Sequence, residues 1–387
     1  MANKLLHSLV LVFSVLLALG SYDPFFPAAS QLTSSHIVLV LFVGSYSFLY
    51  PRSTIEGGMR APVLALFSIF FVLGLSQAFY GDSIYSISPL NIKYLMCVIF
   101  FTVLSSYYSK FPISIHYSLL FYSLSAAIFS MAVLYFFGGA SEIYKGQLIV
   151  FGENPNSTAA RMAVAFVYVM SVCIQNPLTW GRTRYLLLLP AIPLILLIVK
   201  SGSRGALLAV MASAISLIVF SKIKRRHKFY TFTFSLMLLF PLFGYIASIE
   251  GVSARWERVL EGDTAGRTEI WIDAVSIFLN SPVIGVGEGG YYEEMLVRYG
   301  SFIDTHNIIL YLAVSGGVVA VSLFMYFCYS LLSSAWRSFQ GGDIFPFVLF
   351  LNIMIVALKT GGVLTYLVMW YLFAMIASYR RLLGALE

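Results

Sequence analysis

Long apolar runs separated by short polar connections dominate the pattern of the chain. Twelve runs are long enough, or nearly long enough, to cross a bilayer, at about 5–20, 36–50, 61–79, 91–107, 114–138, 157–175, 184–200, 204–221, 229–249, 307–331, 344–358 and 361–377. The apolar positions are continuous rather than alternating, which argues against a β-barrel. We therefore expect an all-α integral membrane protein with about 12 transmembrane helices, in which residues 1–387 form a single polytopic domain.

One long hydrophilic stretch, 250–306, separates the ninth run from the tenth. Within 268–280, Trp271, Val275 and Phe278 recur at helical spacing, which predicts an amphipathic helix at the membrane interface that ends at Ser281 and Pro282. A glycine-rich turn over 285–290 follows, and a second short helix carries the apolar residues of 292–299. We expect a structured loop whose glycine turn approaches a membrane-bound substrate.

The basic residues set the predicted orientation. Five of them, at 222, 224, 225, 226 and 228, lie between the eighth and ninth runs, which places that connection in the cytoplasm. Alternation then places both termini in the cytoplasm and loop 250–306 in the periplasm, if the first run is a retained span. The first run could also be a cleaved signal peptide, but its removal would leave an odd number of spans.

Composition supports this class and excludes others. Apolar residues make up 59% of the chain and charged residues 11%, against about 45–50% and about 25% in globular proteins. The basic residues behind the net charge of +7 follow the predicted topology and do not form one patch. We therefore have no reason to expect nucleic acid as a partner. Ten of the 17 acidic residues lie in loop 250–306 and none of the others lies within a run. The absence of intramembrane carboxylates argues against an ion-coupled transporter.

Polar residues precede the sixth, eighth and tenth runs, which all begin at the periplasmic side in this topology. Free backbone N–H groups and the positive end of the helix dipole make such sites suited to anions, above all phosphate. Basic residues nearby would add hydrogen bonds to phosphate oxygens. Simple helix caps and snorkelling anchors are the alternative interpretation. The residues concerned are Asn154, Asn156 and Arg161 for the sixth run, Lys200, Ser203 and Arg204 for the eighth, and Asp304, His306 and Asn307 for the tenth.

The gathering of these residues on one side of the membrane predicts an anionic lipid-linked substrate and a base. Four aromatic residues of the outer loop could contact the sugar or serve as interfacial anchors; they are Trp256, Trp271, Tyr291 and Tyr292. The sequence contains no Asp-x-Asp motif and no cluster of metal ligands, so we expect no metal and no cofactor. Asp304 and Glu288 are alternative bases to His306.

Several motifs resemble the bacterial O-antigen ligase and O-antigen polymerase superfamily of membrane glycosyltransferases. They are Asn154-Pro-Asn156, the stretch 203–208 beginning Ser-Arg-Gly, the stretch 266–271 beginning Gly-Arg-Thr, the stretch 281–287 ending Gly-Val-Gly, and His306-Asn307 followed by Gly316-Gly317. Together they cover about 150–320. The ligase-like pattern continues to a Gly, Thr or Tyr at position 320, where this chain has Ala320.

The resemblance implies a membrane enzyme of the bacterial inner membrane that moves a glycan from undecaprenyl diphosphate to an acceptor hydroxyl. It implies that Arg204 and Arg267 hold the diphosphate and that His306 activates the acceptor. The acceptor would be a lipid-linked repeat unit for a polymerase of O-antigen or exopolysaccharide, or the lipid A core for a ligase in lipopolysaccharide biosynthesis. A chain-length regulator commonly accompanies such polymerases.

We favour a repeat-unit polymerase, and an O-antigen ligase is the first alternative. A protein O-oligosaccharyltransferase of the same family is a second. A flippase or exporter of lipid-linked sugars without catalysis is a third, against which the acidic, structured outer loop argues.

Overall fold

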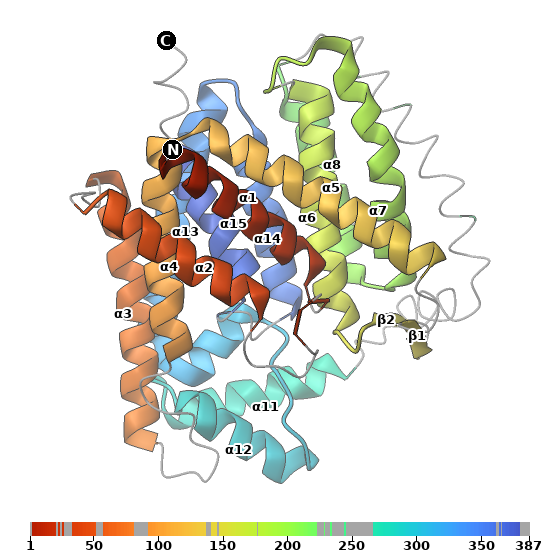
Figure 1. The fold of residues 1–387 in the computed structure, drawn as a ribbon. Coiled ribbons are helices and arrows are strands. Elements are labelled where there is room, and N and C mark those ends of the chain that lie inside the picture. The colour runs from red at the N-terminus through yellow and green to blue at the C-terminus, as the bar shows by residue number, and fades with distance from the viewer. Residues whose placement is uncertain are drawn as a thin grey trace.

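A computed structural model describes most of the chain as a bundle of helices (Figure 1). The described residues are 2–20, 22–23, 25–26, 33–51, 57–80, 92–136, 141–144, 147–175, 177–222, 228, 233, 244, 266–360, 364 and 366–379. The ninth predicted run apart from residues 233 and 244, the first part of the outer loop and Trp256 lie outside them.

Helices account for nearly all the regular structure. The helices before the outer loop are α1 (Ala2–Leu19), α2 (Ser34–Leu49), α3 (Gly57–Tyr80), α4 (Ile92–Lys110), α5 (Ile113–Tyr135), α6 (Pro155–Gln175), the 3₁₀ helix η1 (Gly181–Leu187), α7 (Leu188–Lys200) and α8 (Arg204–Phe220). Those from the outer loop onward are α11 (Arg267–Asn280), α12 (Gly287–Tyr299), α13 (Ile308–Gln340), α14 (Phe345–Thr360) and α15 (Leu367–Ser378). A short antiparallel hairpin pairs β1 (Ser141–Tyr144) with β2 (Gln147–Val150), with Ser141 opposite Val150.

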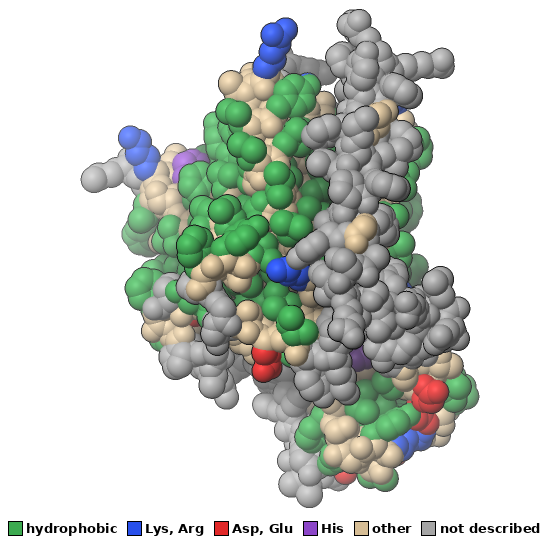
Figure 2. Space-filling model, turned by 90° about the vertical axis from the view of Figure 1, so that its right-hand side faces the viewer, with side chains coloured by type: hydrophobic (Ala, Val, Ile, Leu, Met, Phe, Trp, Pro, Cys, Tyr) green, Lys and Arg blue, Asp and Glu red, His purple; other side chains and the backbone are tan. Residues whose placement is uncertain are grey.

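Within the described part of the chain, helices cover eleven of the twelve predicted runs. Five of these described helical segments are long and apolar enough to cross a membrane, namely Met59–Tyr80, Ile113–Tyr135, Pro155–Gln175, Gly181–Lys200 and Ile308–Gln340. Several of their large apolar side chains point outward, as Leu64 does at 63% exposure, which is costly in water and natural in lipid. Figure 2 shows hydrophobic side chains over much of the described surface between the two ends of the molecule. The all-α membrane class is thus confirmed, while the number of crossings and their sidedness stay predictions.

Helix ends alternate between the two ends of the bundle. Helices α11 and α12 lie across one end (Figure 1), where Gln77 near the end of α3 accepts a 2.8 Å hydrogen bond from the Gly289 N–H. Tyr94 near the start of α4 also contacts α12, through Glu288. At the opposite end, Lys222 beyond α8 donates to the carbonyl of Gln340, the last residue of α13. The starts of α8 and α13 therefore share the end of the bundle that carries α11 and α12.

Helix α13 is broken near its start, and the glycine-rich turn fills the break. Gly317 has φ 65° and ψ −167°, which is a conformation for glycine. The backbone groups released by the break bond to the turn, since Val286 N–H donates to Val314 O at 2.8 Å and Val318 N–H donates to Pro282 O at 2.8 Å. Irregular backbone at membrane depth requires such internal partners.

The first part of this glycine turn packs against neighbouring helices, and its approach to a substrate stays a prediction. A Cβ on Gly285 would lie 2.5 Å from the Gly316 nitrogen, and one on Gly287 would lie 2.9 Å from the Gln77 side chain. These glycines permit close contact with α13 and α3, because a side chain would fill the space that the neighbouring helix occupies.

The two predicted interfacial helices are present and pack on each other. Ile270, Ala274 and Ile277 of α11 form a buried cluster with Tyr291 and Met295 of α12 and Val314 of α13. Arg298 and Tyr299 of α12 both donate hydrogen bonds to the carboxylate of Asp273 in α11. The cluster fixes α11, and with it Arg267, against the start of α13.

Candidate functional site

Two of the predicted site arginines begin helices that meet at one end of the bundle. Arg204 is the first residue of α8, and Ser203 caps that helix by accepting a 3.4 Å hydrogen bond from Ala206 N–H. Arg267 is the first residue of α11 and follows Gly266, whose φ of 71° suits glycine. Both arginine side chains are partly buried.

The charge balance at the two arginines suits an anion. Burial lowers the pKa of the Arg267 guanidinium, the positive charge of Arg204 lowers it further, and the negative charge of Asp304 opposes both effects. Two guanidinium groups repel each other, and the repulsion is stronger where water is partly excluded. An anion that lies between them offsets this repulsion. Arg204 and Asp304 therefore both lie within electrostatic reach of Arg267.

The segment 304–307 carries the candidate base and is held by α11. The indole N–H of Trp271 donates to the backbone carbonyl of Thr305 at 2.9 Å. The side chain of Asn307 caps α13, accepting from Ile309 N–H at 3.0 Å and Leu310 N–H at 3.2 Å. Between these anchors His306 adopts φ 52°, an uncommon left-handed conformation for a residue with a side chain. Strain of this kind persists where the surrounding structure imposes it, and it clusters at functional sites.

Asp304 lies beside His306. The backbone N–H of His306 donates to the Asp304 carboxylate at 3.4 Å. Burial raises the pKa of Asp304, while the charge of His306 and hydrogen bonds from its backbone and from Thr305 lower it. A carboxylate next to an imidazole can orient the ring and stabilise its protonated form. The pair suits a histidine base with an acidic neighbour.

Glu288, the other alternative base, contacts the spans. Its carboxylate accepts a 2.9 Å hydrogen bond from Tyr94 of α4, whose hydroxyl lies 3.2 Å from that of Tyr311 in α13. The negative charges of Asp304 and Glu288 both contribute to a raised pKa of Tyr292, after burial as the main cause. Tyr292 therefore lies within electrostatic reach of both acids, on the α12 side of the site.

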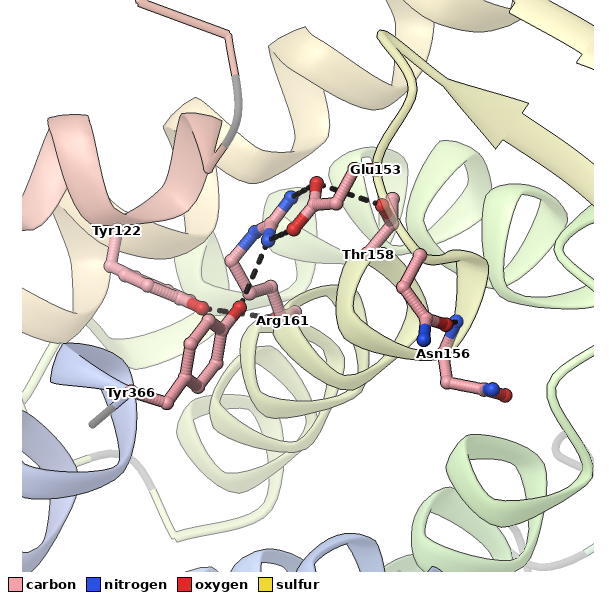
Figure 3. A network of polar contacts seen from close by, with 7 residues as sticks. Tyr122, Glu153, Asn156, Thr158, Arg161 and Tyr366 are labelled. Atoms are coloured by element: carbon pink, nitrogen blue, oxygen red, sulfur yellow. Dashed lines mark hydrogen bonds and ion pairs between the residues drawn. The ribbon is translucent and has the colours of Figure 1, made fainter. Parts of the chain in front are cut away.

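The Arg161 side chain binds other residues of the protein (Figure 3). The sequence predicted instead that it would be available to a phosphate group. Its side chain is 1% exposed and forms an ion pair with Glu153, which precedes α6. The same guanidinium donates to the Tyr366 hydroxyl at 2.9 Å, and Thr158 donates to Glu153 at 3.0 Å. These contacts join the start of α6 to the start of α15. The carboxylate of Glu153 offsets the cost of burying the Arg161 guanidinium.

The remaining predicted binding residues lie at helix ends. The side chain of Asn154 accepts the Asn156 backbone N–H at 2.9 Å, so it forms the turn into α6. Asn156 is partly buried in the first turn of that helix (Figure 3). Lys200 is the last residue of α7, across the turn from Arg204. For Asn154, Ser203 and Asn307 the structure supplies the capping interpretation.

The aromatic residues of the outer loop divide into two groups. Tyr291 is fully buried in the cluster between α11 and α12, which leaves its ring no access to a sugar. Trp271 and Tyr292 are partly buried next to the segment 304–307 and Asp304. Of the three candidate aromatic residues that the structure describes, Trp271 and Tyr292 are therefore better placed than Tyr291 to contact a glycan.

One basic residue at this end was not singled out by any motif. Lys359, in the last turn of α14, lies with its ammonium 6.0 Å from the centroid of the Trp271 ring. Its only signal in the sequence is a positive charge at the periplasmic end of a predicted span, a position that many snorkelling lysines share. Among the described residues, no group of three or more His, Cys, Asp or Glu side chains could hold a metal ion.

The fold and this site define a multi-pass, all-α membrane protein with a basic site at one end. Residues 189–325 match the family model described as O-Antigen ligase. The match supports membership in the O-antigen ligase and O-antigen polymerase superfamily, confirms the resemblance carried by the motifs, and indicates a membrane glycosyltransferase. It spans Arg204, Arg267 and His306. A search of curated proteins gave no significant match.

Proposed function

We propose that the protein transfers a glycan from undecaprenyl diphosphate to an acceptor hydroxyl at the periplasmic face of the inner membrane. The observation that carries this proposal is that α11, which begins at Arg267, holds the segment presenting His306 through Trp271, with Arg204 in electrostatic reach of Arg267. Two arginines suit a diphosphate, and a histidine next to a carboxylate suits a base that works near neutral pH. The family match supports the reaction type.

In the proposed reaction the acceptor oxygen bonds to the anomeric carbon as the bond from that carbon to the diphosphate oxygen breaks. His306 takes the acceptor proton, and Asp304 stabilises the resulting imidazolium. Arg204 and Arg267 stabilise the negative charge that develops on the leaving diphosphate. A direct displacement of this kind inverts the anomeric configuration, and the arginines supply the positive charge that a metal supplies elsewhere.

A repeat-unit polymerase is our leading proposal, with an O-antigen ligase as the alternative. Ala320 departs from the ligase-like motif, which favours the polymerase. In the structure Ala320 is fully buried beside Gly316, in the part of α13 that follows the break at Gly317. The description of the matched family as O-Antigen ligase favours the alternative. Both reactions would use the same donor site.

The test replaces each donor-site arginine in cells that lack the native gene. We expect Arg204→Ala and Arg267→Ala each to abolish the long-chain glycan while the protein still inserts in the membrane. Mutations that remove one preorganised charge contact cost about 10²–10³ in rate. Arg337→Ala is the matched control, because Arg337 lies in the last turn of α13 at the other end, where its guanidinium donates hydrogen bonds to Ser333 of the same helix. Normal activity in both test variants would refute the proposal.

The same cells separate polymerase from ligase. A gel of lipopolysaccharide that shows core carrying one repeat unit, without the long ladder, indicates a polymerase. Bare core, together with long polymer accumulating on undecaprenyl diphosphate, indicates a ligase.

A further inference from the structure

Lys359, from the distant helix α14, lies close to neighbours of the two arginines. Its Cβ lies where it would be 3.0 Å from a Cβ on Gly205, the residue that follows Arg204 in α8. Its ammonium lies 6.0 Å from the ring of Trp271, which is one helical turn beyond Arg267 in α11. Lys359 therefore packs between Gly205, which follows Arg204, and Trp271, which lies one helical turn from Arg267.

Gly205 makes this approach possible. A larger residue at 205 would place its Cβ in tight contact with the stem of Lys359, and the lysine would have to move away from the start of α8. The lysine stem crosses α8 here while the ammonium extends toward α11. A lysine that only anchors a span extends instead to the nearest water.

Three basic side chains lie at this site. Arg204, Arg267 and Lys359 contribute three positive charges, and Asp304 contributes one negative charge. None of the ion pairs among the described residues involves Lys359. Three positive charges suit a sugar–lipid diphosphate, which carries one negative charge on each phosphate. Release of the sugar adds a further negative charge to the leaving diphosphate.

We propose that Lys359 is a third donor-binding residue, which contacts the diphosphate together with Arg204 and Arg267. This inference rests on the proposed function. It assigns a substrate contact to α14, outside the region 189–325 that the family model matches. The contact would be strongest with the free undecaprenyl diphosphate product, because that diphosphate carries the most charge.

The experiment measures binding of undecaprenyl diphosphate to the full-length protein in lipid nanodiscs. We expect Lys359→Met, which keeps the length of the side chain and removes its charge, to weaken binding by about tenfold or more. Lys359→Arg should retain most of the binding. Lys110→Met is the matched control, since Lys110 also lies in the last turn of a helix with its ammonium over an aromatic ring, 3.3 Å from the centroid of Tyr50.

The outcomes separate this inference from the proposed function. Loss of binding in Arg204→Ala and Arg267→Ala, with unchanged binding in Lys359→Met, would overturn only the role of Lys359. Unchanged binding in all three variants would overturn the diphosphate site itself.

A second measurement uses the unmodified protein, in case Lys359→Met does not fold. Undecaprenyl diphosphate should protect Lys359, but not Lys110, from acetylation by an amine-reactive ester, as followed by mass spectrometry. Equal modification of Lys359 with and without the lipid would overturn the inference.

Discussion

Arg161 and Arg204 occupy similar positions in the sequence, near the start of a predicted span and after polar capping residues. In the structure, however, their surroundings differ. Arg161 is 1% exposed and paired with Glu153, whereas Arg204 is partly exposed beside Arg267. Burying an isolated guanidinium is costly, so the carboxylate next to Arg161 offsets that cost inside the protein. Arg204 lies within electrostatic reach of Arg267, and two neighbouring cations suit an external anion.

His306 provides a test at the scale of one residue. His306→Asn should keep the local backbone, because asparagine tolerates the left-handed conformation at φ 52°. It removes the imidazole, which is the proposed proton acceptor. We expect glycan transfer to fall by about 10²–10⁴-fold, the usual contribution of a general base. Transfer is measured with purified protein, and binding of undecaprenyl diphosphate should remain unchanged.

The control for this variant is His306→Ala, which also removes the imidazole but fits the left-handed conformation less well. Its transfer rate should fall equally, with lower thermal stability. A fully active His306→Asn would contradict the prediction and indicate that Asp304 or Glu288 is the base.

At the scale of elements, the break in α13 depends on a backbone fit between two glycine motifs that are distant in sequence. Val283 and Gly317 approach so closely that a Cβ on Gly317 would lie 2.1 Å from the Val283 carbonyl oxygen. Hydrogen bonds from Val286 and Val318 complete the contact. The fit sets where α13 begins relative to α11, and therefore where Asn307 and His306 lie.

Gly317→Ala should disrupt this element. The substitution adds a side chain in a conformation that only glycine adopts readily, and the new atom would overlap Val283. We expect destabilisation of at least about 3 kcal/mol, with a low yield of folded protein. Thermal unfolding in detergent measures the effect.

Gly44→Ala is the control for that experiment. Gly44 lies within α2 with nothing within 4 Å of an added Cβ, so its replacement should leave stability unchanged or slightly higher. Equal stability of the two variants would show that the fit between the turn and α13 does not hold the site.

At the scale of the whole molecule, the alternation of helix ends brings the starts of α8 and α13, the end of α14 and the helices α11 and α12 to one end of the bundle. In Figure 2 acidic and basic side chains gather at the end that carries α11 and α12, beyond the apolar belt. We propose that this end faces the periplasm, following the basic residues that the sequence places at the other end.

Labelling of introduced cysteines tests this orientation. Ser276 is exposed on α11, and Thr183 is exposed in η1. We expect Ser276→Cys to react with a membrane-impermeant maleimide in intact cells with a permeabilised outer membrane, and Thr183→Cys to react only after the inner membrane is opened. The native residues Cys97, Cys173 and Cys328 are buried, which limits background labelling. The reverse pattern would place the site in the cytoplasm.

The apolar runs were sufficient to predict most helices, because the length of a span and its lack of charge are local properties of the chain. The periodicity of 268–280 likewise predicted α11, and Ser281 with Pro282 predicted its end. The motifs that contain Arg204, Arg267 and His306 can also be recognised in the sequence, since their capping neighbours and family resemblance lie in short segments. The roles of these three residues stay predictions.

Only the tertiary structure decided which charges are neutralised inside the protein and which meet at the site. The hydrogen bond from Arg161 to Tyr366, the contact of Lys359 with Gly205 and Trp271, and the fit of Gly285 against α13 all join distant segments. Burial and Coulomb energies depend on distance in space, which a linear pattern does not contain. The sequence by itself therefore determined the helices and the chemical groups, and the packing of the helices determined which groups can act together.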